Sequence, residues 1–321
     1  MTMDYLRRSE PEAAGSATRA GEICESVAAR LGPIEGIKAV ALGGSRARGT
    51  AREDSDIDLA LYYDSAAPFA IDELDSAACE LDDRHTSGLV TQFGAWGPGV
   101  NGGGWLLLDG HHVDWLYRDL RRVRSIIEEC VGGRIDAFYQ LGHPLGFQSQ
   151  IYVGEVHVCQ PLYDQIGELA KLKQLVTVYP QKMRRALTDK HLFDAQFEIE
   201  IAAGPAARGD IVYVSQCLAR AAGFMVLVLH ALNERFFLNE KNAFIESMSF
   251  ALYPRNFHRE VERILAQPGD CPSALTDSVA SMRAVANELR GFCEEQYPPE
   301  AANDLTAAVR QQSAEKFKTT T

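Results

Sequence analysis

The sequence predicts an α/β domain of the α+β type, followed by an all-α helical bundle domain. Short apolar and alternating stretches typical of strands occur up to about residue 120, separated by amphipathic helical patterns. Beyond that point the pattern becomes mostly helical. A chain of 321 residues with 46% hydrophobic content is long enough to form two cores. We place the first domain at residues 1–140 and the second at 141–321.

The first domain begins with a helix in which Ile23, Val27 and Leu31 recur every four residues. The expected elements in chain order are a helix over 16–31, a strand ending at Leu42, a strand over 56–61, a helix over 70–85, a β segment over 87–93, a glycine-rich loop over 94–104 and a β-hairpin over 106–117.

Proline and glycine divide the chain beyond about residue 120 into helices. The expected helices cover residues 120–130, 165–178, 180–202, 210–236, 256–267 and 271–295, with breaks at Tyr179-Pro180, Gly204-Pro205 and Gln267-Pro268-Gly269. This spacing predicts a bundle.

Composition excludes several classes of protein. No apolar run reaches the roughly 18–20 residues that span a bilayer, so no membrane association is expected. Seven widely spaced cysteines without a Cys-x-x-Cys pair indicate neither a disulfide framework nor a structural zinc, and predict the reducing cytoplasm. The net charge of −12 disfavours binding of extended nucleic acid. A monomer or a homodimer is expected.

A glycine turn follows the first strand. Gly43 and Gly44 let the backbone turn tightly and approach a bulky anion, and Ser45 lies where a helix can begin. The free N–H groups and dipole of a helix N-terminus favour a triphosphate there. Arg46 has the charge to contact such a group, although an arginine in a polar loop is also commonly solvated.

Two aspartates follow the turn after ten intervening residues. Asp56 and Asp58 flank Ile57, and because side chains of a strand alternate, both carboxylates point to one face. Such a pair repels itself and is stabilised by a divalent cation, for which Mg²⁺ is expected.

A third carboxylate would complete a site for two Mg²⁺ ions, and we choose Asp114. The run that ends at Leu108, followed by Asp109-Gly110 and then Val113, predicts a hairpin with Asp114 in its second strand. Asp109 is then a turn residue.

Gly-Gly-Ser, ten residues, Asp-Ile-Asp and a later strand aspartate together resemble the nucleotidyltransferase (DNA polymerase beta) superfamily. Within it, the chain is similar to bacterial stand-alone enzymes with a helical C-terminal domain, a group that includes the aminoglycoside and lincosamide adenylyltransferases. The resemblance implies a nucleotidyltransferase domain with a mixed sheet and a helical substrate-binding domain. In the antibiotic adenylyltransferases a lysine of the helical domain reaches the triphosphate, and the resemblance makes Lys241 the candidate here. The alternative is that Lys241 is an ordinary surface lysine that faces solvent and does not contact the triphosphate.

The predicted reaction is Mg²⁺-dependent transfer of NMP, AMP from ATP in the first instance, to a hydroxyl of a small molecule, with release of pyrophosphate. An antibiotic of aminoglycoside type is one such acceptor, which would give a role in antibiotic resistance. Asp56, Asp58 and Asp114 are the predicted catalytic and metal-binding residues. The alternatives are transfer to RNA or to a protein hydroxyl, as in toxin–antitoxin systems, and a catalytically silent nucleotide-binding protein. The sequence leaves the general base open, with Glu198 and Glu200 as candidates beside Asp114.

Overall fold

The computed structural model describes residues 14–296. Within this range the chain forms two compact units, one built from residues up to 193 together with 226–250, and the other from 194–225 and the residues from 251 onward. Each unit is a set of residues that contact one another, and neither unit is one continuous stretch of the chain. The domain boundary predicted at residue 140 therefore stays a prediction.

A five-stranded mixed sheet forms the centre of the first unit, as the sequence predicts. Its strands are β1 (Ile37–Leu42), β2 (Ile57–Tyr63), β3 (Gly103–Leu108), β4 (His111–Asp119) and β7 (Gln160–Tyr163). Their order across the sheet is β3-β4-β2-β1-β7, in which β2 and β4 run parallel and all other neighbours are antiparallel. Two further strands, β5 (Ala137–Phe138) and β6 (Phe147–Gln148), pair with each other.

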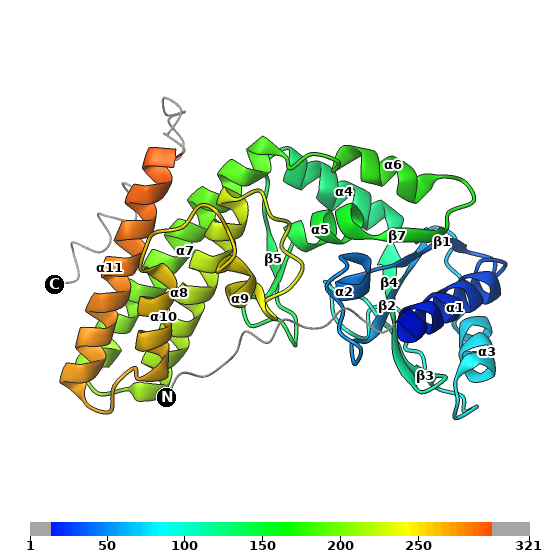
Figure 1. The fold of residues 1–321 in the computed structure, drawn as a ribbon, viewed down its shortest axis with the longest axis horizontal. Helices are drawn as coiled ribbons and strands as arrows, with labels where there is room; N and C mark the ends of the chain where they lie inside the picture. The colour runs from blue at the N-terminus through cyan, green and yellow to red at the C-terminus, as the bar shows by residue number, and fades with distance from the viewer. Residues whose placement is uncertain (1–13, 297–321) are drawn as a thin grey trace. The chain divides into compact units, whose positions relative to one another are not determined.

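Helices lie on both sides of this sheet. Figure 1 shows α1 (Ala14–Leu31) and α3 (Ile71–Leu81) on one side, and α4 (Leu120–Val131), α5 (Gln150–Val158) and α6 (Glu168–Leu175) on the other. The first unit also contains the short helices α2 (Gly44–Ala47) and α9 (Ala243–Ser247), the start of α7 (Gln181–Ala207) and the end of α8 (Ile211–Leu232).

The core of the first unit follows from the alternation of the strands. Ile57 and Leu59 belong to the same buried core as Val27 and Leu31 of α1, and all four side chains are fully buried. Burial of one such side chain contributes about 1.5–3 kcal/mol. Because Ile57 and Leu59 of β2 are buried in this core, Asp58, which lies between them in the strand, points to the opposite face of the sheet.

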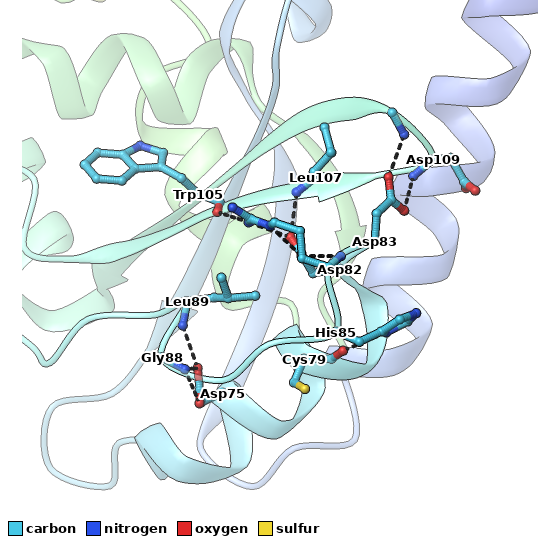
Figure 2. A network of polar contacts seen from close by, with 12 residues as sticks. Asp75, Cys79, Asp82, Asp83, His85, Gly88, Leu89, Trp105, Leu107 and Asp109 are labelled. Atoms are coloured by element: carbon cyan, nitrogen blue, oxygen red, sulfur yellow. Dashed lines mark hydrogen bonds and ion pairs between the residues drawn. The ribbon is translucent and has the colours of Figure 1, made fainter.

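A polar network holds the β3–β4 hairpin in place (Figure 2). Asp109 and Gly110 have positive φ angles of 51° and 77°, as a tight hairpin turn requires, and both amides donate to the Asp83 carboxylate. Asp82, whose side chain is fully buried, accepts from the Leu107 amide at 2.8 Å and pairs with Arg84 at 2.7 Å. The end of α3 thus fixes β3.

The second unit is helical. It contains the remainder of α7 and α8, together with α10 (Phe257–Ala266) and α11 (Pro272–Gln296). Glu198 of α7 pairs with Arg220 of α8 at 2.7 Å, and Glu200 pairs with Arg283 of α11 at 3.0 Å. Both candidate bases of the sequence analysis are therefore engaged in ion pairs within this unit.

Local predictions were wrong at two places. Residues 87–93 form no strand, and only Val90 makes an isolated bridge to Gly104. Gly204-Pro205 does not end α7, which contains Pro205 and continues to Ala207.

Among the described residues, α8 is the one helix long and apolar enough to cross a membrane by length and composition. Much of it is buried inside the protein, which is also the property of a core helix.

Candidate nucleotidyl-transfer site

The two central carboxylates lie on adjacent parallel strands. Asp58 of β2 and Asp114 of β4 are register partners, so their side chains emerge side by side from the same face. Each is flanked by residues fully buried in the core on the other face, Ile57 and Leu59 for Asp58. The core thus forces both carboxylates outward.

Asp56 lies one residue before β2 and is exposed. Its negative charge raises the pKa of both Asp58 and Asp114, which places it near the pair. The structure sets Asp58 beside Asp114, with Asp56 two residues before Asp58 in the chain, and the roles of the three aspartates stay a prediction.

Burial and repulsion make this cluster attractive to cations. Desolvation raises the pKa of Asp58 to about 6, and the charges of Asp114 and Asp56 reinforce the shift. Desolvation also raises the pKa of Asp114 to about 6, with Asp56 adding to it. Within residues 14–296, none of the three carboxylates accepts a hydrogen bond or forms an ion pair with another side chain.

The donor set suits Mg²⁺. Over the described part of the chain, no three His, Cys, Asp or Glu side chains form a ready-made metal cage. Mg²⁺ does not need one, because it is commonly held by one or two carboxylates together with water and substrate phosphates. Asp58 and Asp114, unpaired and adjacent, fit that requirement.

The glycine turn lies directly against Asp58. The Gly43 amide donates to the Asp58 carbonyl at 2.8 Å, so the end of β1 is fixed beside the carboxylate. Gly44 has φ of +59°, and a Cβ there would overlap Asp58 Oδ2. Glycine is therefore required for conformation and for space. The short helix α2 begins at Gly44, one residue before the start expected at Ser45.

Arg46 binds protein backbone. Its Nη2 donates to the Ser55 carbonyl at 2.6 Å and its Nε to the Asp56 carbonyl at 3.2 Å. The guanidinium thus fixes the backbone of the loop that carries Asp56. Its predicted contact with a triphosphate stays a prediction.

Lys241 comes near the carboxylates from a distant part of the chain. It is exposed, and its positive charge lowers the pKa of both Asp58 and Asp114. The adjacent Glu240 accepts from the Leu145 amide at 3.2 Å and contacts His143 at 2.9 Å. These contacts hold the segment that carries Lys241.

A second tie joins this segment to the turn. Glu246 of α9 pairs with Arg48, which ends α2, at 3.2 Å. Residues 239–247 and the glycine turn are therefore linked within the same compact unit.

Glu155 is a neighbour of the site that the sequence analysis missed. It lies on α5, and its charge contributes to the raised pKa of Asp58. Arg118, which is 3% exposed, donates to both of its carboxylate oxygens at 2.7 and 2.8 Å. Arg118 lies on the same face of its strand as Asp114, and the alternation of β4 could have indicated this from the sequence. No local sequence pattern indicates a role for Glu155.

Among the comparisons with known proteins, the match to a family model bears on this site. A family model described as a nucleotidyltransferase domain matches residues 22–91, a range that contains the glycine turn, Asp56 and Asp58. A nucleotidyltransferase-like protein from Exiguobacterium sibiricum 255-15 is structurally similar, with 9% identity and a TM-score of 0.42, over 87% of this chain and 77% of that one. No curated protein shows significant similarity in sequence.

The family model ends before Asp114, so it does not test that residue. The narrower resemblance to aminoglycoside and lincosamide adenylyltransferases stays a prediction. Residues 22–91 match a nucleotidyltransferase domain, and this match supports nucleotidyltransferase activity for the chain.

Proposed function

We propose that this chain transfers NMP, AMP from ATP in the first instance, to a hydroxyl of a small acceptor and releases pyrophosphate. The observation that carries the proposal is the register of Asp58 opposite Asp114, beside the turn that begins at Gly43. Carboxylates next to a phosphate-type turn are what transfer between a triphosphate and a hydroxyl requires.

The glycine turn would hold the triphosphate. Gly44 leaves space at the carboxylate, and the backbone amides that follow it carry no side-chain cap. Lys241, whose charge reaches both aspartates, would offset negative charge that develops on the phosphates.

Asp56, Asp58 and Asp114 would hold Mg²⁺, which when bound neutralises phosphate charge and makes an acceptor hydroxyl easier to deprotonate. The acceptor oxygen forms a bond to the α-phosphorus, and the bond between the α- and β-phosphates breaks. Asp114, whose strand is separated from the turn by β2, would receive the hydroxyl proton. We propose that the enzyme acts in the cytoplasm as a monomer or a homodimer.

The first experiment measures pyrophosphate release from each of the four NTPs with Mg²⁺. The acceptor panel contains hydroxylated antibiotics, aminoglycosides among them, and total RNA. The native chain is compared with the Asp56→Ala/Asp58→Ala variant. Asp54→Ala is the matched control, because Asp54 lies in the same loop with its side chain 76% exposed.

Acceptor-dependent release that is lost in the double variant and kept in the control would support the proposal. Release that depends on RNA would favour the alternative acceptor. Equal release by the native chain and the double variant would contradict the roles of Asp56 and Asp58.

A further inference from the structure

Four arginines lie within residues 118–124, around the start of α4. Three of them form ion pairs with a carboxylate: Arg118–Glu155, Arg121–Asp64 and Arg124–Glu168. The fourth is Arg122, for which no ion pair is found between residues 14 and 296. Its charge is therefore left for another partner.

The Arg122 side chain is held in place without an acceptor for its Nε. Its guanidinium carbon lies 5.1 Å from the centroid of the Phe138 ring. The Nε atom is buried and has no hydrogen-bond partner in the described part of the chain. A buried donor without an acceptor is unfavourable, so the structure leaves room for a ligand that supplies one.

Arg122 lines a cavity of about 410 Å³ that the glycine-rich loop borders. Gly94, Gly97 and Pro98 of this loop contribute to the lining. Tyr117 of β4 and Tyr152 of α5 add aromatic rings, and Asp119 and Asn101 add polar groups. The cavity thus combines flat apolar surface with two opposite charges.

Hydrogen bonds hold the loop around this cavity. Asn101 Nδ2 donates to the Tyr63 hydroxyl at 2.8 Å, and Asn101 Oδ1 accepts from the Gly94 amide at 2.8 Å. The Tyr152 hydroxyl donates to the Gly99 carbonyl at 2.6 Å. The cavity is therefore preformed.

The two charged groups of the cavity lie close to each other. Asp119 caps α4 and Arg122 is its third residue, positions whose side chains meet at the first turn of a helix. Asp119 Oδ1 accepts from the Ser65 and Arg121 amides, whereas Oδ2 accepts no hydrogen bond from residues 14–296. Burial raises the pKa of Tyr63, and the charges of Asp119 and Arg122 shift it in opposite directions, so both lie near one hydroxyl.

We propose that this cavity binds a free α-amino acid with a large uncharged side chain. Arg122 binds the carboxylate, Asp119 binds the ammonium group, and the side chain lies against the tyrosine rings. The planar guanidinium matches a carboxylate, and bonds between charged groups are the strong ones. An α-amino acid carries both charges on one carbon atom, which suits two charged side chains from the same helical turn.

The charges of the cavity disfavour other ligands. A phosphate or a dicarboxylate would bring negative charge to Asp119, and a polyamine would bring positive charge to Arg122. A neutral nucleobase would leave both charges uncompensated in a partly closed space. A zwitterion compensates both at once.

This site is separate from the carboxylates of the candidate transfer site. Asp119 is the last residue of β4, five residues beyond Asp114 and about 17 Å further along the strand. Tyr117 belongs to the buried core, whereas Asp114 points to the opposite face of the sheet. The inference therefore goes beyond the proposed function and does not depend on it.

Calorimetric titration of the full chain tests the inference. The ligands are L-phenylalanine and L-leucine. Their analogues 3-phenylpropionate and 4-methylpentanoate lack the amine, and phenethylamine and 3-methylbutylamine lack the carboxylate. We expect at least one of the two amino acids to bind the native protein, and each of its analogues to bind at least about 10-fold more weakly.

Variants assign the binding to this cavity. Arg122→Gln should weaken binding about 10- to 100-fold, because it removes a charged hydrogen-bonding partner. Asp119→Asn removes the charge but keeps a good helix cap, and should weaken binding about 10-fold. Arg121→Gln is the matched control, because Arg121 lies in the same turn but pairs with Asp64, outside the cavity. This control and Asp56→Ala/Asp58→Ala should both bind with native affinity.

Failure of both amino acids to bind the native chain would overturn the inference. Equal binding of the amino acid and either analogue would do the same, because one of the two charges would then have no role. Unchanged affinity in Arg122→Gln would place the ligand elsewhere, and loss of binding in Asp56→Ala/Asp58→Ala would place it at the transfer site. Binding of inorganic phosphate that depends on Arg122, without binding of an amino acid, would assign the cavity to simple anions.

Discussion

Gly44→Ala tests whether the glycine turn and Asp58 work as one unit. The new Cβ would overlap Asp58 Oδ2 and lie 2.7 Å from its Cγ, so the carboxylate must move by about 1 Å or more. A displacement of about 1 Å in a reacting constellation costs about 100-fold in rate, or about 2.7 kcal/mol of transition-state stabilisation. The positive φ adds a cost of about 1–2 kcal/mol to stability.

Gly49→Ala provides the matched control. Gly49 has φ of +69° and nothing within 4 Å of an added Cβ, so this variant carries the backbone cost without the overlap. In chemical denaturation both variants should show the backbone cost, and Gly44→Ala should lose additional stability through the overlap. Gly44→Ala should show kcat/KM about 100-fold lower in pyrophosphate release, whereas Gly49→Ala should stay close to native. Equal activity of the two variants would refute the idea that the turn sets the position of the carboxylate.

Three further predictions follow from the contacts around the site. Glu155→Gln leaves the buried Arg118 without its charged partner and should cost about 3 kcal/mol in the free energy of unfolding; a loss below about 0.5 kcal/mol would contradict it. Lys241→Met removes a charge that lowers the pKa of Asp58, so NMR titration of the metal-free protein should find that pKa higher, and an unchanged value would place the lysine elsewhere. The pKa of Asp82 is lowered to about 2 from its ordinary value of 3.8, chiefly by its hydrogen bond from an arginine. This shift stabilises the folded state by about 1–2 kcal/mol, a value reduced by solvent screening because the arginine is half exposed. The stabilisation is present above about pH 4 and is lost as pH falls toward 2. Asp82→Asn should abolish this part of the acid dependence of the free energy of unfolding.

Surface variants serve as controls for these measurements. Glu260→Gln breaks an exposed pair with Arg263 and should change stability by less than about 1 kcal/mol. Lys171→Met removes an exposed lysine whose partner is Glu168, and it should leave the titration of Asp58 unchanged.

Local sequence patterns predicted the elements that carry their own periodicity. The recurrence of Ile23, Val27 and Leu31 predicted α1, and all three side chains are buried. Asp109-Gly110 predicted the turn between β3 and β4, where both residues have positive φ. Alternation around Ile57 predicted that the aspartates face away from the core. These signals are local, so they can be recognised without the rest of the chain.

Other parts of the fold depend on partners distant in sequence. Residues 150–158 form α5 with almost no amphipathic pattern, because most of its side chains are buried on several sides. Strand β7 exists because Pro161 and its neighbours pair with β1, more than 100 residues earlier. Neither feature has a local signature strong enough to predict it.

The sequence by itself determined the candidate residues of the site: a glycine turn, two alternating aspartates and a third strand aspartate. Strand periodicity and turn preference act over a few residues, so a short stretch of sequence reveals them. The tertiary structure alone decided which groups meet there. The parallel pairing of β2 with β4 set Asp58 against Asp114. The contacts of Glu240 with residues 143–145 hold the segment that carries Lys241. Such neighbours depend on packing between elements far apart in the chain, which no short stretch of sequence specifies.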